Sequence, residues 1–544
     1  MMRYSFLSAM VSVSGATFAS RITGFVRDVL LAQVLGASAA ADIFVVAFRL
    51  PNLFRRLFGE GAFNAAFVPL LSERLAGQKT INREALQFAS RILTILTLTL
   101  LVLVIVAEIF MTDIIRLIAP GFVDDPTKFS ASVFYARITF PYLFFISLLS
   151  LFGACLNVSG RFIVAALAPI LLNVVFIIAM GLAYINGATH TNAPFDNNIL
   201  DFIIVGIAVA GVLQFMVVYW AAVRAGWRVP FSLATLWNLK RGLKEAPHER
   251  RFFRLAMPGI LAGGVGQINL LIGTAIATAE SGAAAWLYYA DRLYQLPLAL
   301  LGGALSIVLL PDLSRLIGDK GAVRQRLNNV WLIACAISLA AAAGLFVLAV
   351  PITRLLFEGG VFSTTDSLAV ATAVQIFCFG LPAFILLRPL QAVFFAHQDT
   401  RAPLIDSSIS VGVNITLSLS LFPHYGYIAI AIATSVAAWV NVVLALWRLY
   451  RRDIWHISGR MGLQILAQVL ATSAMAGFVY GGAMWFFTPT FLSDAVGPLG
   501  QWQWRVAGIG GLCVLIGAAL VVFLVLVFLL RGLRRTDWKN LRQA

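Results

Sequence analysis

Charged residues are scarce in this sequence. Asp, Glu, Lys and Arg make up 12% of the 544 residues, whereas hydrophobic residues make up 60%. Soluble domains carry about 25% charged residues, so the composition argues against an ordinary soluble protein. Many apolar runs reach the roughly 20 residues that span a bilayer, and they are continuous rather than alternating as in a β-barrel. The composition predicts a polytopic α-helical membrane protein.

Cysteine and histidine are also scarce. The four cysteines fall inside apolar runs, and we interpret them as small core hydrophobes rather than as disulfide partners or metal ligands. The five histidines fall in expected loops or helix ends and lack ligand spacing. The sequence contains neither a Walker A motif nor a Gly-rich nucleotide loop. We therefore predict a protein that is not an enzyme and has no bound metal or cofactor.

Acidic residues are fewer than basic ones, 24 against 40, which gives a net charge of +16. In a soluble protein such an excess would suggest nucleic-acid binding. In a membrane protein it follows from the enrichment of Lys and Arg in cytoplasmic loops, so we expect no nucleic-acid partner.

Fourteen segments are long and apolar enough to be membrane helices. Their approximate spans are 8–34, 41–72, 88–112, 130–157, 162–186, 199–223, 252–278, 283–311, 327–350, 366–395, 403–422, 426–447, 461–487 and 506–530. The first one resembles a signal peptide at its start, but its helical pattern continues, so we interpret it as an uncleaved helix. Pro or Gly interrupts the second, eighth and tenth spans, which is tolerated only where the backbone faces protein or a watery cavity.

The distribution of Lys and Arg predicts the orientation. With a cytoplasmic N-terminus, 27 of the 40 basic residues fall on the cytoplasmic side and four fall outside. This asymmetry predicts that both termini are cytoplasmic, as an even number of helices requires.

The chain also contains an internal repeat. Five landmarks recur at offsets of 238–243 residues; Pro141 matches Pro382, for example, and Arg161 matches Arg401. This predicts two pseudo-symmetric six-helix lobes related by an axis along the membrane normal. The expected lobes are 1–238 and 255–452, joined by a basic cytoplasmic linker, 239–254. The last two helices and a basic cytoplasmic tail occupy 453–544.

Once the basic residues of the loops, linker and tail are counted, nine remain within the predicted spans, and all nine are arginines. They are Arg21, Arg27, Arg49, Arg55, Arg56, Arg91, Arg137, Arg292 and Arg388. A charge at the bilayer centre costs about 2.5–3.5 kcal/mol, and a guanidinium group stays protonated. These arginines therefore need water, acidic partners or an anionic ligand.

Helical spacing supplies some local partners. Arg21, Gly24 and Asp28 share one face of the first helix, whereas Arg27 is expected to point elsewhere. Asp291 precedes Arg292 directly and points about 100° away from it on a helix.

The second span has its own candidate pairs. Asp42 and Arg49 are one heptad apart, and Arg56 and Glu60 form an i, i+4 pair. Arg55 is left without an obvious local acid.

Two interpretations of the arginines stay open. In one, internal salt bridges hold the helices in register. In the other, the arginines line a water-filled cavity and bind an anion, for which the planar fork of guanidinium suits phosphate. A voltage sensor does not fit, because its arginines recur at every third position along one helix.

Three stretches resemble signatures of the bacterial lipid II flippases of the MurJ/MviN family. They are SRITGFVRDVLLAQVLGASAAADIFVVAFRLPNLFRRLFGEGAFNAAFVPLLSE (20–73), YYADRLYQLPLALLGGALSIVLLPDLS (288–314) and AHQDTRAP (396–403). The resemblance covers essentially the whole chain. It places the chain in the multidrug/oligosaccharidyl-lipid/polysaccharide exporter superfamily.

The resemblance implies two lobes around a cationic cavity and a C-terminal hydrophobic groove for a polyprenyl tail. It implies that the cargo is lipid II, an undecaprenyl-pyrophosphate carrying a disaccharide-pentapeptide. Alternating access would move it from the inner to the outer leaflet of the bacterial cytoplasmic membrane for peptidoglycan synthesis. We further expect a monomer in contact with membrane lipids, near cell-wall synthases. Coupling to an ion or to the membrane potential is left open.

The resemblance also implies roles for individual residues. The family's cavity arginines match Arg21, Arg27, Arg55 and Arg292, which we expect to bind the pyrophosphate. The family's important acids match Asp28, Asp42 and Glu60. We expect gating or supporting roles for Gly24, Asp28, Asp42, Arg49, Arg56, Glu60 and Asp291. Gln295 departs from the pattern of those relatives that carry an acid there, and the family's acidic sodium site has no clear counterpart here.

Two alternatives compete with this function. A flippase for another polyprenyl-pyrophosphate oligosaccharide, of the O-antigen type, needs the same headgroup chemistry. A non-transporting scaffold for cell-wall synthesis needs no hydrated arginine cavity. A drug/cation antiporter fits less well, because it would use buried acids rather than arginines.

Overall fold

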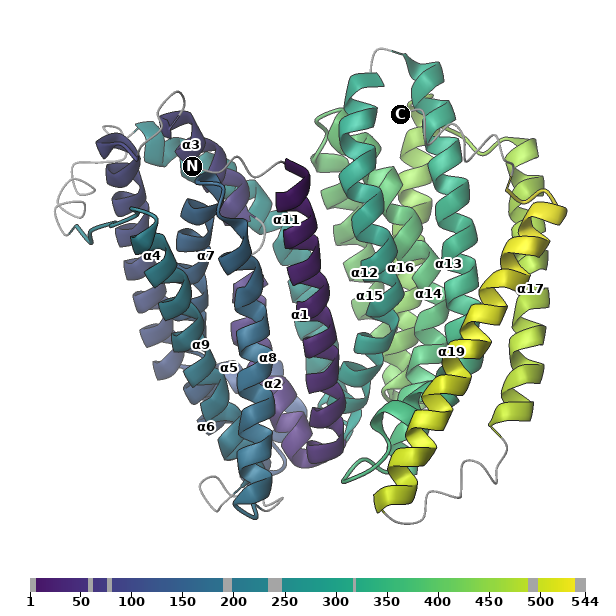
Figure 1. The fold of residues 1–544 in the computed structure, drawn as a ribbon, viewed down its shortest axis with the longest axis horizontal. Helices are drawn as coiled ribbons and strands as arrows, with labels where there is room; N and C mark the ends of the chain where they lie inside the picture. Colours follow the sequence, from purple (N-terminus) through teal and green to yellow (C-terminus); the bar gives the residue numbers. More distant parts are fainter. Residues whose placement is uncertain are drawn as a thin grey trace. The chain divides into compact units, whose positions relative to one another are not determined.

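The computed structural model describes residues 6–56, 62–75, 81–188, 198–232, 247–316, 319–487 and 498–533. These described residues form helices and no β-strand (Figure 1), which confirms the all-α class. Their contacts divide the chain into two units, Met1–Ala285 and Trp286–Ala544.

The helices of the first unit follow one another along residues 6–277. They are α1 (Phe6–Leu35), α2 (Ala39–Phe54), α3 (Ala62–Leu75), α4 (Arg83–Ile109), α5 (Met111–Ile118), the short η2 (Pro120–Phe122), α6 (Pro126–Thr139), α7 (Tyr142–Val158), α8 (Phe162–Ile185), α9 (Ile199–Arg224) and α11 (Pro247–Ala277). Those that begin at the unit boundary or beyond it are α12 (Ala283–Leu316), α13 (Lys320–Phe357), α14 (Thr364–Ala396), α15 (Arg401–Tyr425), α16 (Ile428–Arg451), α17 (Gly459–Phe486) and α19 (Pro498–Leu529).

Ten helical stretches within the described residues are long and apolar enough to cross a membrane. They confirm a multi-span membrane protein. The count of fourteen stays a prediction, because α1, α2, α3, α11 and α12 are not among these ten.

Two predicted spans are broken. The span 41–72 consists of α2 and α3, and 130–157 consists of α6 and α7. Pro141 stands directly before α7, where its missing N–H removes a helical hydrogen bond. The predicted break at Gly59 and Gly61 lies outside the described residues.

The described part of the predicted linker, residues 247–254, is helical and opens α11. By contacts α11 belongs to the first unit, where it packs on α3. Arg251 of α11 donates two hydrogen bonds, of 2.9 and 3.1 Å, to the carboxylate of Glu73 on α3. The division into repeated lobes with a linker stays a prediction.

Aromatic side chains fix the helices around the candidate site. In the first unit α1 lies beside α8, and α8 packs on α9 (Figure 1). The ring of Phe48 on α2 lies 6.0 Å from Phe176 on α8 and 6.1 Å from Tyr142 on α7. Phe44, one turn earlier on α2, meets Phe176 edge-on at 6.1 Å. Such contacts add to the burial of the rings and hold the end of α2 against α7 and α8.

In the second unit, α14 and α16 approach closely at Gly380. A Cβ atom at Gly380 would lie 2.9 Å from the Cα of Ser435, so only glycine fits without a shift of the backbone. Ser435 also donates a 2.9 Å hydrogen bond to the carbonyl of Ile376. The two helices are therefore locked at this level.

We predict that Gly380→Val lowers the thermal unfolding temperature of the purified protein. Overpacking of this kind costs about 1–3 kcal/mol. Gly412→Val on α15 is the control, because nothing lies within 4 Å of a Cβ there. Differential scanning fluorimetry in detergent measures both variants, and equal unfolding temperatures for the two would contradict the account.

Candidate functional site

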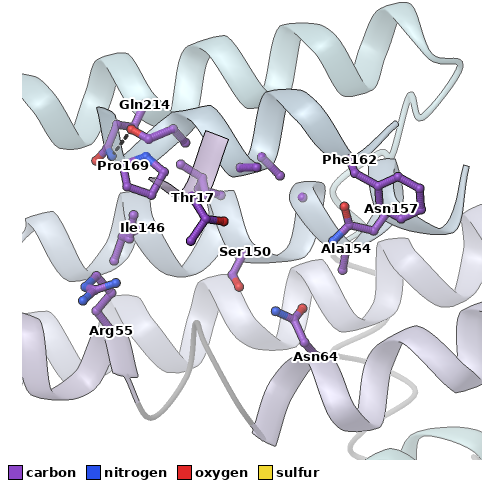
Figure 2. A pocket seen from close by; sticks show the side chains of 15 residues that line it. Thr17, Arg55, Asn64, Ile146, Ser150, Ala154, Asn157, Phe162, Pro169 and Gln214 are labelled. Atoms are coloured by element: carbon purple, nitrogen blue, oxygen red, sulfur yellow. Dashed lines mark hydrogen bonds between the residues drawn. The ribbon is translucent and has the colours of Figure 1, made fainter. Parts of the chain in front are cut away.

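The candidate site centres on a cavity of about 570 Å³ in the first unit. Its lining comes from α1, α3, α7, α8 and α9, together with the residue that follows α2 (Figure 2). The polar lining side chains are Thr17, Arg55, Asn64, Ser150, Asn157 and Gln214. The cavity therefore combines one cation with neutral donors and acceptors.

Arg55 supplies the cation. α2 ends at Phe54, so Arg55 lies where the helix stops, and its side chain is half-buried. Its Nε and Nη2 donate hydrogen bonds of 3.1 and 3.0 Å to the amide oxygen of Asn52. Asn52 thereby orients the guanidinium group that lines the cavity. Arg56 follows and is also half-buried, while its expected partner Glu60 lies outside the described residues.

Arg27 is held by a local cluster on α1 and α8. Its Nη2 and Nε lie 2.7 and 3.0 Å from the carboxylate of Asp28, and its Nη1 donates a 2.9 Å hydrogen bond to Asn173. The guanidinium carbon also lies 5.2 Å from the ring centroid of Phe176. The expectation that Arg27 points away from Asp28 is therefore wrong, because the long side chain bends back over its neighbour.

Gly24 provides the room for this cluster. A Cβ at Gly24 would lie 3.3 Å from the amide nitrogen of Asn173, and that nitrogen donates hydrogen bonds to Ser20 and Thr23. α1 continues without a break through Gly24, so the glycine permits a close helix contact here.

Arg21 differs from Arg27 in its surroundings. Its side chain is exposed, and it has no hydrogen-bond or ionic partner among the described residues. Arg21 and Asp28, which helical spacing places on one face, do not form an ion pair, because Asp28 pairs with Arg27 instead.

Asp42 is fully buried and forms a different pair from the expected one. It lies 2.8 Å from the Nζ of Lys128 on α6 and accepts backbone N–H bonds from Gly282 (2.9 Å) and Ala285 (3.2 Å). Arg49, one heptad away on α2, donates instead to Thr274 on α11 at 2.9 Å. An isolated buried carboxylate is very costly, and Lys128 with the two N–H groups compensates Asp42.

In the second unit, Arg292 lies on α12 with its guanidinium carbon 4.6 Å from the ring centroid of Tyr288. Asp291 accepts a hydrogen bond from Gln295, one turn later on the same helix. The departure from the family pattern at Gln295 therefore gives Asp291 a neutral donor.

Three arginines of the predicted spans, Arg91, Arg137 and Arg388, have no predicted role. Arg388 on α14 is exposed and has neither a hydrogen-bond nor an ionic partner among the described residues. The sequence indicates that Arg388 lacks a local counter-charge, because no Asp or Glu lies within four residues of it in a long apolar span.

The chemistry of the site follows from its side chains. The part of the chain that the structure describes contains no group of three His, Cys, Asp or Glu side chains that could hold a metal ion. Guanidinium, amide and hydroxyl groups remain, and such a set of donors binds anions.

Apolar helices long enough to cross a membrane, with one arginine in a hollow between them, define the class, a polytopic helical membrane protein. A solved structure described as an inward-facing multidrug resistance MATE family transporter of the MOP superfamily shares the fold. It has a TM-score of 0.62 and 16% identity, and the alignment covers 82% of this chain and 98% of that one.

The family model described as lipid II flippase MurJ matches residues 31–494. The probable lipid II flippase MurJ of Rhizobium meliloti (strain 1021) is 39% identical, with 97% of this chain and 94% of the relative covered. The lipid II flippase MurJ of Burkholderia cenocepacia is 35% identical, with 96% of each covered. A solved lipid II flippase MurJ in an inward closed conformation has 26% identity and a TM-score of 0.71, covering 93% of this chain and 98% of that one. The chain belongs to the lipid II flippase MurJ family.

The buried pair of Asp42 and Lys128 yields a prediction about stability. We expect Asp42→Asn to destabilise the protein by about 3–5 kcal/mol, because it leaves the Lys128 ammonium buried without its counter-charge. Adding Lys128→Met removes that charge and should recover much of the loss. Thermal unfolding in detergent of both variants checks this, and a double variant less stable than the single one would refute it.

Proposed function

We propose that this protein is a flippase that moves lipid II from the inner to the outer leaflet of the bacterial cytoplasmic membrane, where peptidoglycan synthesis consumes it. Membership of the lipid II flippase MurJ family over residues 31–494 is the observation that carries this proposal. The cavity in the first unit supports it, because Arg55 lines this cavity and the headgroup of lipid II carries a pyrophosphate.

In this proposal Arg55, which lines the cavity, binds the pyrophosphate, with Arg21 and Arg27 of the same unit as further donors. Arg292 stays a donor predicted from the sequence alone. Guanidinium groups donate paired hydrogen bonds to phosphate oxygens, and they stay charged at every physiological pH. The cavity volume of about 570 Å³ lies within the 300–1,000 Å³ typical of ligand pockets. The neutral lining side chains Asn64, Ser150 and Gln214 suit hydroxyl and amide groups of the attached sugar. The polyprenyl tail stays in the lipid.

Asp28 is proposed to control the availability of Arg27. In the structure a carboxylate oxygen of Asp28 lies 2.7 Å from the guanidinium group of Arg27. A pyrophosphate carries more negative charge and more acceptor oxygens than one carboxylate, so it competes for the same donors. Gly24 keeps Asn173 beside the pair as a neutral partner for either state.

Transport by alternating access needs no covalent step, so we propose a non-enzymatic cycle. With a negative cell interior, outward movement of the anionic headgroup is favoured by about 2.3 kcal/mol per charge per 100 mV. The same membrane potential also favours the inward return of the empty, positively charged site. We further propose that both termini are cytoplasmic and that the protein works as a monomer near cell-wall synthases.

The experiment is lipid II translocation by the purified protein in vesicles. We predict that Arg55→Ala lowers the rate by about tenfold or more, since a hydrogen bond to a charged group contributes about 1.5–3 kcal/mol. Arg55→Lys should retain part of the rate, because it keeps the charge but loses the fork. Arg116→Ala is the control, since Arg116 forms an exposed pair with Asp113.

Two outcomes would contradict the proposal. One is a wild-type protein that leaves lipid II in its original leaflet, as a scaffold would. The other is an Arg55→Ala variant that transports as fast as Arg116→Ala. Equal transport of an O-antigen-type polyprenyl-pyrophosphate oligosaccharide would show that the site reads only the pyrophosphate.

A further inference from the structure

An exposed aromatic stripe runs along α16 in the second unit. Val436, Trp439, Val443, Trp447 and Tyr450 recur every three or four residues, so they share one helix face. All five are exposed, Val443 by 59% and Tyr450 by 67%. Along a helix, the stretch from Val436 to Trp447 rises by about 16 Å, close to the roughly 15 Å of one leaflet's hydrocarbon.

The stripe ends in a hollow of about 430 Å³. Its walls are the last turns of α16, including Trp447 and Tyr450, and the connecting residues 455–457. Trp455 anchors the connection, because its buried indole donates to Asn328 of α13 and packs on Trp331 at 5.5 Å. Trp455 therefore fixes one wall of the hollow.

Most charges around the hollow already have partners. Arg448 pairs with Asp406 at 2.7 Å, and Arg452 pairs with Asp399 at 2.7 Å. Burial opposes the ionisation of Asp399, but hydrogen bonds from the backbone of Ala402 and from Arg452 outweigh it and lower its pKa.

Arg451 is different. Its guanidinium carbon lies 5.3 Å from the ring centroid of Trp447, and it has no hydrogen-bond or ionic partner among the described residues. The only acid between residues 446 and 460 is Asp453, which pairs with Arg324 at 3.2 Å. His456 lines the hollow and is exposed. The hollow thus has an imidazole in its wall, and an available guanidinium group lies beside Trp447, one of its lining residues.

We propose that this groove binds a phospholipid with an anionic headgroup. The acyl chain lies along the stripe, the glycerol region meets Trp447 and Tyr450, and the phosphate accepts hydrogen bonds from Arg451 and His456. Trp and Tyr prefer the membrane–water interface, and basic pockets beside membrane helices select anionic lipids. A purely apolar face would accept every lipid, so Arg451 is the residue that creates selectivity. This lipid is distinct from the transported cargo, whose headgroup is proposed to bind in the cavity of the first unit.

The test uses the full chain in vesicles of phosphatidylcholine that contain equal fractions of brominated phosphatidylglycerol or brominated phosphatidylcholine. Bromine quenches nearby tryptophan, and the signal of Trp447 is the difference between wild type and Trp447→Phe. We expect the anionic lipid to quench Trp447 more strongly. The apparent affinity should be about fivefold higher than for phosphatidylcholine, because one arginine contributes about 1 kcal/mol to the binding of an anionic lipid. Arg451→Gln should abolish the preference.

Arg224→Gln is the matched control. Arg224 ends α9 in the first unit and stacks on Trp220, four residues earlier, at 3.5 Å, but it does not line this hollow. It should leave the lipid preference of Trp447 unchanged. Equal quenching of Trp447 by both lipids, or a preference that survives Arg451→Gln, would overturn the proposal. Trp447 that neither lipid quenches would also overturn it, since a second copy of the chain would then cover the stripe.

Discussion

The rest of this structure depends on one constraint: a charge inside an apolar helical protein needs a counter-charge, water or a ligand. The first unit contains several solutions to it. Asp42 is fully buried and is compensated by Lys128 and two backbone N–H groups. Arg27 is compensated by Asp28 and Asn173. Arg55 lines a cavity instead. The surroundings of a charge, rather than its residue type, thus separate the fully buried pair of Asp42 and Lys128 from the arginines that are proposed to bind the headgroup.

Packing between helices holds these charges in place. Phe48 and Phe176 hold α2 against α8, and the missing Cβ of Gly24 lets Asn173 approach α1. The Phe176 ring covers the guanidinium group of Arg27, whereas Asn52 orients the guanidinium group of Arg55 that lines the cavity. A site built in this way has its donors oriented before the ligand arrives, which lowers the entropic cost of binding.

The sequence could predict much of the fold, because continuous apolar runs specify membrane helices whatever their partners are. It could not predict which charges pair. Asp42 pairs with Lys128, which is 86 residues away in sequence, and not with Arg49, which is seven residues away on the same helix. The side chain of Arg27 bends back to pair with Asp28, although adjacent side chains on a helix point in different directions. Such choices depend on side-chain reach and on tertiary neighbours. The contact between Arg451 and Trp447 could not be predicted either, because the positive-inside rule already explained Arg451 as one of many cytoplasmic basic residues.

The central claim is that water and the headgroup of lipid II both reach the cavity beside Arg55. The most direct test is cysteine labelling at Ser150, which lines that cavity. Ser150→Cys is introduced after the four native cysteines are replaced, and a charged, membrane-impermeant thiol reagent is applied to vesicles. The account predicts labelling that lipid II slows and that a phospholipid without pyrophosphate does not. An unreactive cysteine, or a labelling rate that lipid II leaves unchanged, would contradict it.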